Sequence, residues 1–244
     1  MLLPDDQTRI LTVLQMGEIH LQGQFLNGSN YTFLVQVQHA GETLGAVYKP
    51  TRGEQPLWDF PTGTLAKREV AAYRLSERLG WKLVPPTLYR RKKLPLGAGS
   101  LQFYVDYDPN DHYFNFSQAD VQCLRPTVTF DLLMNNADRK GSHILRAADG
   151  HFWLIDHGVC FNIEEKLRTV VWDFAGQVIP ADLLRDVQQL VDDLTGLQAV
   201  PEDFKGLLRL SELRALVRRA NTLLETRTFP IPSRTHRPYP YPPL

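Results

Sequence analysis

Three short segments near the amino terminus alternate apolar with polar residues, and the tight turns between them constrain the fold more than any other feature of the sequence. Residues 18–26 and 31–37 show this period of two, and residues 43–50 continue it as far as a proline. The first connection contains Asn-Gly, which favours the positive φ angles of a tight hairpin. Turns this short join antiparallel strands. The chain is therefore predicted to begin with an antiparallel meander.

A helix and two further strands are predicted after this meander. Residues 64–79 place apolar side chains at helical spacing, with Thr64 positioned to cap the first turn and Gly80 to end the last one. Strands are predicted at residues 84–90 and 101–106. Further along the chain we expect helices at 126–136, with Pro126 in the first turn, and at 181–195, 202–209 and 211–226, together with a hairpin at 143–155.

The order of these elements predicts an α+β protein with two lobes. Residues 1–107 would form an antiparallel-sheet lobe with one helix, and residues 108–228 a mostly helical lobe that begins at a cluster of turn-forming residues. The 244 residues are 43% hydrophobic, which is enough for a sizeable core. Residues 229–244 are rich in proline and are expected to be extended on the surface or disordered.

Charge and cysteine content argue against several functional classes. Lysine plus arginine number 27, as do aspartate plus glutamate, so the net charge gives no attraction to nucleic acid or anionic membranes. No stretch reaches the ~18 consecutive apolar residues of a membrane span, and no secretory signal is recognisable. Cys123 and Cys160 lie far apart without a His/Cys cluster, which argues against zinc or a disulfide framework. We therefore expect a protein of the reducing cytoplasm.

Two charged residues of the first lobe suggest a place for phosphate groups. Lys49 lies on the third strand, on the face opposite Ala46 and Tyr48, and Glu69 lies in the middle of the following helix. A carboxylate on a neighbouring helix can fix the flexible ammonium group of a strand lysine, and such pairs hold nucleotide phosphates. Taken alone, the two residues are equally well explained as a lysine that keeps an edge strand soluble and an exposed helical carboxylate.

Two aspartates of the second lobe complete the pattern. Asp138 follows a predicted helix in the sequence ADRKGSH, and Asp156 ends the predicted hairpin in the sequence DHG. Either aspartate alone could simply form a turn. Together with the lysine they supply what phosphoryl transfer requires: positive charge on the phosphates, a carboxylate ligand for Mg²⁺, and a carboxylate that orients the acceptor hydroxyl.

The segments around these residues resemble a known family. ADRKGSHIL followed by HFWLIDHG is similar to the catalytic and metal-binding segments of phosphatidylinositol 3- and 4-kinases and their bacterial relatives, in which GDRHxxNIL precedes IDFG. Residues 45–87 more closely resemble an uncharacterised actinobacterial-type group of phosphatidylinositol 3-/4-kinase-like proteins. The resemblance covers residues 17–180. It implies a two-lobed, protein-kinase-like fold.

The same resemblance implies a role for each residue that occupies a motif position. In the first lobe, it assigns Ser29 and the backbone amides of the turn at 27–30 to cover the phosphates, Lys49 to bind them and Glu69 to hold Lys49. The strand ending at Asp106 would form the adenine hinge. In the second lobe, Asp138 would be the catalytic carboxylate and Asp156 the principal magnesium ligand.

Two positions depart from the family's motif. His143 stands where the family has a metal-binding asparagine, and imidazole is a poorer partner for Mg²⁺ than an amide oxygen, so Mn²⁺ is an alternative metal. Lys140 stands where the lipid kinases have a histidine, and its charge is expected to neutralise the transferring phosphate. Asn135 and Asn136 either replace the lost metal ligand or cap the preceding helix.

The function predicted from these residues is ATP-dependent phosphoryl transfer, with Mg²⁺, to a hydroxyl group of an unidentified acceptor. A protein side chain or a small molecule is expected before a lipid. Residues 159–177 occupy the place of a substrate loop, and their basic and aromatic side chains either form a groove or pack in the lobe. Trp58 and Asp59 either cover the nucleotide or pack. A catalytically weak nucleotide-binding module and AMP transfer on the same fold are the alternative functions.

Overall fold

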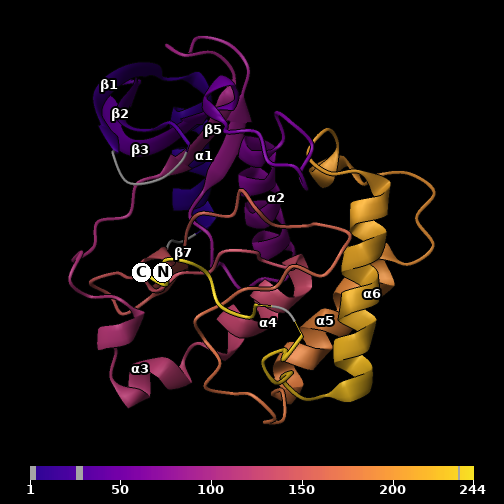
Figure 1. The fold of residues 1–244 in the computed structure, drawn as a ribbon. Coiled ribbons are helices and arrows are strands. Elements are labelled where there is room, and N and C mark those ends of the chain that lie inside the picture. The colour runs from indigo at the N-terminus through magenta and orange to yellow at the C-terminus, as the bar shows by residue number, and fades with distance from the viewer. Residues whose placement is uncertain (1–3, 26–29, 236) are drawn as a thin grey trace.

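An antiparallel sheet of five strands forms the upper lobe of the protein (Figure 1). The computed structural model describes residues 4–25, 30–235 and 237–244. The strands lie in the order β1-β2-β3-β5-β4, so the predicted meander of the first three strands is confirmed. Their bounds are β1 Glu18–Phe25, β2 Thr32–His39, β3 Glu42–Pro50, β4 Thr87–Arg90 and β5 Gly99–Phe103. The edge strands of the sheet are β1 and β4.

Helix α1 (Pro4–Met16) covers one face of this sheet and was not predicted. Its side chains Ile10, Val13 and Leu14 are buried against residues of β2 and β3, among them Tyr48. Successive side chains of a strand point to opposite faces. Because Tyr48 points toward α1, the neighbouring Lys49 points away from it, as the sequence predicted.

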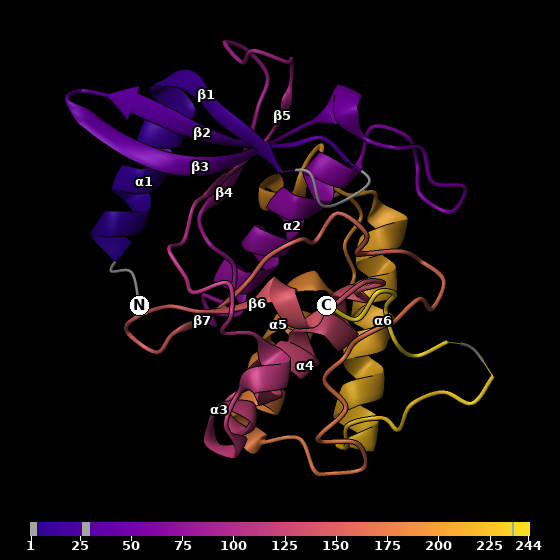
Figure 2. The ribbon, with the colours of Figure 1, turned by 60° about the vertical axis from the view of Figure 1, so that its left-hand side comes forward.

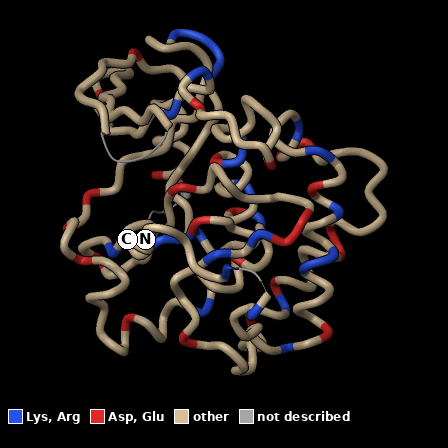
Figure 3. Tube along the Cα trace, in the orientation of Figure 1, with Lys and Arg blue, Asp and Glu red and all other residues tan. Residues whose placement is uncertain are grey.

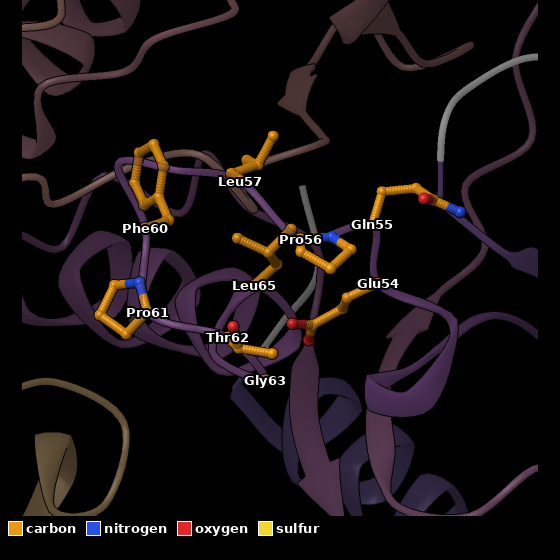
Figure 4. Close-up of a pocket in the computed structure, with 9 residues that line it drawn as sticks. All are labelled: Glu54, Gln55, Pro56, Leu57, Phe60, Pro61, Thr62, Gly63 and Leu65. Carbon is orange, nitrogen blue, oxygen red and sulfur yellow. The ribbon is translucent and has the colours of Figure 1, made fainter.

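Helix α2 (Leu65–Arg78) follows the prediction closely, and Gly80, whose φ of 70° suits glycine, lies just beyond its end. The prediction that Thr64 caps its first turn is wrong. The Thr64 hydroxyl donates to the Pro61 carbonyl (2.6 Å), and the Ala66 N–H donates instead to a carboxylate oxygen of Glu54 (2.9 Å). Figure 4 shows Glu54 beside the start of the helix, at a pocket of about 10 Å³ that has room for roughly one water molecule.

The lower lobe is mostly helical, as predicted, and a short hairpin lies on one side of its helices (Figure 2). Its core includes the apolar stripe of α5, which packs beside α6. The short α3 was not predicted. The elements are α3 Gln118–Gln122, α4 Arg125–Met134, β6 Ile144–Arg146, β7 Phe152–Leu154, α5 Ala181–Leu194 and α6 Leu210–Thr226.

Three predicted elements are shorter than expected, two of them because of proline or glycine. The predicted helix at 202–209 is only a single 3₁₀ turn, Glu202–Phe204, and Gly206 with a φ of 73° interrupts it. The strand predicted from residue 84 begins at Thr87, since the two preceding prolines lack the N–H that a strand ladder needs. The strand predicted to reach residue 106 ends at Phe103.

Within the proline-rich segment, the described residues 229–235 and 237–244 contain no helix and lie beside the lower lobe, in keeping with the extended one of the two predicted alternatives. Figure 3 shows basic and acidic residues interspersed along both lobes. None of the helices in the described part of the chain is both long enough and apolar enough to span a membrane.

Candidate functional site

A cleft of about 940 Å³ lies where the sheet meets the lower lobe. Most of the polar residues predicted from sequence line this single cleft. They are Lys49 and Glu69 from the upper lobe and Asp138, Lys140, His143 and Asp156 from the lower lobe, with Gln102, Val105, Tyr107 and Arg168 as further lining residues. Residues separated by more than a hundred positions in the chain therefore share one site.

Lys49 joins carboxylates from both lobes. Its ammonium group contacts Glu69 Oε1, and it lies 2.9 Å from Asp156 Oδ1. Burial by itself would lower the pKa of Lys49, but the charges of Asp156 and Glu69 raise that pKa above its ordinary value. Strand β5 packs closely against the backbone of Lys49. A Cβ atom added to Gly99 of β5 would lie only 2.3 Å from the Lys49 carbonyl oxygen. The lysine is thus fixed in position and remains charged.

The two carboxylates differ in their electrostatics. Glu69 is almost fully buried, and this burial raises the pKa of its carboxyl group although Lys49 opposes the effect. The Lys49 ammonium holds the pKa of Asp156 far below its usual range, so Asp156 is ionised. Asp156 also has a φ of 59°, a left-handed conformation that is unfavourable for a non-glycine residue. Such strain is found at sites where the surrounding structure fixes the direction of a side chain.

His143 lies beside Asp156, with 3.4 Å between His143 Nε2 and Asp156 Oδ2. Burial lowers the pKa of His143 to about 4, so its ring is neutral at pH 7. Its Nδ1 lies 3.0 Å from the carbonyl oxygen of Asp138, which only accepts, and 3.4 Å from the backbone nitrogen of Lys140, which only donates. We assign the ring proton to Nδ1 on the shorter of these two contacts. Nε2 then presents a lone pair toward an ionised carboxylate. Two acceptors facing each other fit a divalent cation between them.

The donor set restricts how a metal would be held. Among the described residues, no group of three or more His, Cys, Asp or Glu side chains is arranged to hold a metal ion. The protein thus offers one imidazole nitrogen and one carboxylate. Divalent cations with so few protein ligands take the rest of their shell from water and substrate phosphates. The residues fit a metal that enters with a nucleotide.

Asp138 is positioned by the loop that follows α4. Its N–H donates to the Asn136 side-chain oxygen (3.0 Å), and Lys140 Nζ lies 3.7 Å from its carboxylate. Burial raises the pKa of Asp138 to about 6, an effect that Lys140 opposes and the charge of Asp156 reinforces. A carboxyl group with a pKa close to neutrality can accept a proton from a hydroxyl more readily than an ordinary aspartate.

Asn135 and Asn136 have structural roles. Asn135 ends α4 with a φ of 55° and donates to the carbonyls of Asn162 (3.0 Å) and Glu164 (2.6 Å). Asn136 donates to Asp131 (3.0 Å). Both side chains are buried and neither lines the cleft. Of the two predicted alternatives, the structure supports the contacts that end the helix and not metal binding.

Several other predictions have different outcomes. The side chain of Asp106 is exposed and does not line the cleft, whereas Val105 and Tyr107 do, so a cofactor-binding role for Asp106 itself is not supported. Asp106 is exposed to solvent, whereas the residue on either side of it lines the cleft. Ser29 and the rest of the predicted phosphate-covering turn, except Asn30, lie outside the described residues.

The predicted substrate loop divides between packing and the cleft. Phe161 and Val171 are fully buried in the core of the lower lobe, as the packing alternative predicted, while Arg168 lines the cleft. Trp58 is 90% exposed at the cleft, so it does not pack in the upper lobe. The Lys166 ammonium group lies 4.7 Å from its ring centre. A cation–π contact thus joins Trp58 at the cleft to Lys166.

Sequence reasoning missed a buried polar connection behind the site. The His157 N–H donates to Glu69 Oε2 (2.9 Å), and His157 Nε2 lies 2.9 Å from a guanidinium nitrogen of Arg139. Arg139 is fully buried and pairs with Asp131 of α4 at 3.0 Å. His157 and Arg139 each follow one of the predicted aspartates directly in sequence. Their position next to these aspartates was the only feature of the sequence that could have pointed to His157 and Arg139, because the histidines of the chain are scattered and form no recognisable motif.

Comparison with solved structures defines the class of fold. The structure of the Golgi casein kinase with Mn/ADP bound superposes with a TM-score of 0.58 at 14% identity, covering 91% of this chain and 75% of that one. The structure of hydra Fam20 with sugar gives a TM-score of 0.55 at 15% identity, covering 93% and 90% of the two chains. The fold is therefore kinase-like, as the sequence predicted.

A closer relative shows the family. The chain is 40% identical to Protein Rv2133c of Mycobacterium tuberculosis (strain ATCC 25618 / H37Rv), over 99% of this chain and 97% of that protein. The protein described here belongs to the same family as Protein Rv2133c. No family model matches the sequence.

Proposed function

We propose that this protein is a metal-dependent phosphotransferase that binds ATP between residues 1–107 and 108–228 and transfers the γ-phosphoryl group to a hydroxyl. The observation that carries the proposal is the arrangement around Lys49, which contacts Glu69 of α2 and Asp156 of the lower lobe at once. Phosphoryl transfer depends mainly on positioning and on neutralising charge. A fixed cation beside an ionised metal-binding carboxylate supplies both.

Each residue then has a distinct task. Lys49 binds phosphate oxygens, and Glu69 keeps its ammonium group in place. Asp156 and His143 hold the divalent cation, which supplies positive charge to the phosphates when bound. Asp138 accepts the proton of the acceptor hydroxyl, and Lys140 offsets negative charge on the transferring group. The wall that receives the adenine base is formed by Phe103, Tyr104, Val105 and Tyr107, which line the cleft.

The choice of metal follows from His143. An imidazole nitrogen suits transition metals better than it suits Mg²⁺. We therefore propose that Mn²⁺ supports the reaction at least as well as Mg²⁺. The structural neighbour with Mn/ADP bound is consistent with this metal on this fold.

The acceptor is proposed from chemistry shared with the neighbours. One neighbour is named a casein kinase and the other was solved with a sugar. Hydroxyl groups of proteins and sugars are therefore the first acceptors to test. A closer kinship with the phosphatidylinositol kinases rests on the motifs ADRKGSHIL and HFWLIDHG alone, and a lipid acceptor comes second.

ATP labelled at the α or the γ phosphate tests the proposal. The full chain is incubated with Mg²⁺ or Mn²⁺ and with casein, simple sugars or a cell extract, beside Asp138→Asn, Asp156→Asn and the control Asp182→Asn. Asp182 is exposed on α5 and does not line the cleft. We expect γ-label transfer by the wild type and the control. Asp138→Asn should reduce the rate by about 10²- to 10⁴-fold while nucleotide still binds.

The same experiment separates the alternatives. Asp156→Asn should weaken metal-dependent nucleotide binding itself, measured by calorimetric titration with ADP. Transfer of the α label would show AMP transfer instead, and binding without any transfer would show a module that binds nucleotide but does not catalyse. A wild-type chain that binds no nucleotide with either metal would refute the proposal.

A further inference from the structure

The last residues of the chain contact the segments that hold the predicted catalytic residues. The carbonyl oxygen of Pro238 accepts the N–H of Thr169 (3.1 Å) and the indole N–H of Trp172 (3.3 Å). The carbonyl oxygen of Pro243 accepts the N–H of Gly141 (2.8 Å). We name residues 238–244 the C-terminal clasp. Its two ends reach two different loops, and Figures 1 and 2 show this yellow end of the chain lying over the lower lobe.

The clasp and the two loops lie side by side. The Arg139 N–H donates to the Arg168 carbonyl (2.9 Å), and the Val170 N–H donates to the Arg139 carbonyl (3.1 Å). Thr169, between them, directs its own N–H the other way, to Pro238. Residues 168–170 are therefore held between the loop that contains Asp138 and the clasp. The contact at Gly141 brings the clasp back to that loop.

Close packing adds to these hydrogen bonds. A Cβ atom on Gly141 would lie 2.8 Å from the ring of Phe114 and 3.5 Å from a methyl group of Leu244. Only glycine permits this approach without displacing a neighbour. The Trp172 and Tyr239 rings also lie edge to face, with centres 6.5 Å apart. The clasp thus contacts the outer turn of residues 138–143 through both backbone and side chains.

The contacts fall on the acceptor side of the cleft. Asp138 and Lys140 lie on the loop that the clasp contacts through Gly141, and Arg168 lies on the segment that runs between this loop and the clasp. No residue of the clasp lines the cleft, and none belongs to the hydrophobic core of the described lower lobe. The clasp can therefore influence the position of these three side chains without touching the nucleotide.

We infer that the C-terminal clasp is a positioning element of the phosphotransferase: it holds Asp138, Lys140 and Arg168 in the arrangement that the acceptor hydroxyl needs. This inference rests on the proposed function. A misplacement of about 1 Å in a catalytic group can cost ~100-fold in rate. Loss of the clasp should accordingly slow transfer and leave nucleotide binding intact.

The test compares the full chain with a chain that ends at Arg237. We expect kcat for γ-label transfer to fall by about 10- to 100-fold, with the KM for ATP and the dissociation constant for ADP unchanged within about threefold, since the clasp is not part of the cleft. A synthetic peptide of residues 237–244, added in trans, should restore the rate, and a scrambled peptide should not. Circular dichroism at the assay temperature checks that the shortened chain is folded, because a peptide that binds the folded chain would also restore a rate lost through instability.

Two full-length variants test the same contacts. Trp172→Phe removes the indole N–H that Pro238 accepts and keeps an aromatic ring, so it should lower kcat in the same direction. Ile231→Ser changes an exposed side chain upstream of the clasp and should leave kcat unchanged.

The outcomes are distinguishable. A shortened chain that transfers label as fast as the full chain, or faster, would overturn the positioning role, and so would a loss of nucleotide affinity equal to the loss in kcat. A full chain that binds nucleotide but transfers no γ-label would refute the proposed function, and the positioning role with it.

Discussion

A buried ion pair fastens the helix that carries Glu69 to the lower lobe. Arg68, the neighbour of Glu69 on α2, is 2% exposed and pairs with Glu212 of α6, which is 5% exposed. Its guanidinium group also donates to the Cys160 carbonyl and lies 4.9 Å from the ring centre of Phe60. The perturbation that we consider first is Glu212→Ala, which removes the carboxylate and leaves the buried guanidinium without its charge partner.

The size of the effect follows from burial. Breaking a buried ion pair on one side costs about 3–5 kcal/mol, because the remaining charge has neither water nor partner. Glu212 also accepts the N–H of Arg209 (2.7 Å) at the start of α6, and loss of such a cap contributes about 1 kcal/mol. In a protein of this size each kcal/mol lowers Tm by about 2–4 °C. The ion pair alone therefore corresponds to a decrease in Tm of about 6–20 °C.

Urea unfolding followed by circular dichroism measures the free energy directly. Glu202→Ala is the matched control, because it removes a glutamate from an exposed pair with Lys205 and should cost less than about 0.5 kcal/mol. The double variant Arg68→Met, Glu212→Leu removes both charges and should recover most of the loss. A loss below about 1 kcal/mol in Glu212→Ala, or a double variant as unstable as the single one, would refute the reasoning.

Two further predictions concern the site. The pKa of Asp138 is raised to about 6 and its carboxylate form accepts the proton, so kcat/KM should rise with pH below about pH 6 and level off above it. Lys140 lowers this pKa, so Lys140→Met should move the midpoint of the pH profile upward. An unmoved midpoint would exclude Asp138 as the titrating group. His143→Asn replaces a nitrogen ligand by an amide oxygen, so the ratio of rates with Mg²⁺ and Mn²⁺ should shift toward Mg²⁺ by about fivefold or more, and an unchanged ratio would contradict metal binding by His143.

The local elements could be predicted from the sequence because their signals are local. The alternation in β1 to β3, the helical spacing of α2, α5 and α6, and the turn between β6 and β7 all depend on residues close together in the chain. The prediction failed where the sequence pattern of an element was weak, and where a residue distant in sequence formed the contact that a local residue was expected to form. Helix α1 is recognisable mainly through the sheet face that it covers, and the first turn of α2 is capped by Glu54.

The residues of the candidate site could also be named from sequence, since Lys49, Glu69, Asp138 and Asp156 occupy recognisable positions in motifs. Their convergence on one cleft, the neutrality of His143 and the raised pKa of Asp138 depend on burial and on charges contributed by distant segments. The exclusion of Asp106 from the cleft has the same origin.

Only the tertiary structure decided how the site is supported. Arg68 and the clasp act through contacts between residues far apart in sequence, and no periodicity records such pairs. The proline-rich composition of residues 229–244 predicted an extended or disordered chain, because proline cannot continue a helix or pair in a central strand. The carbonyl oxygens of the clasp accept from the N–H groups of Gly141, Thr169 and Trp172. The fold of the lower lobe alone places these N–H groups where the clasp can reach them.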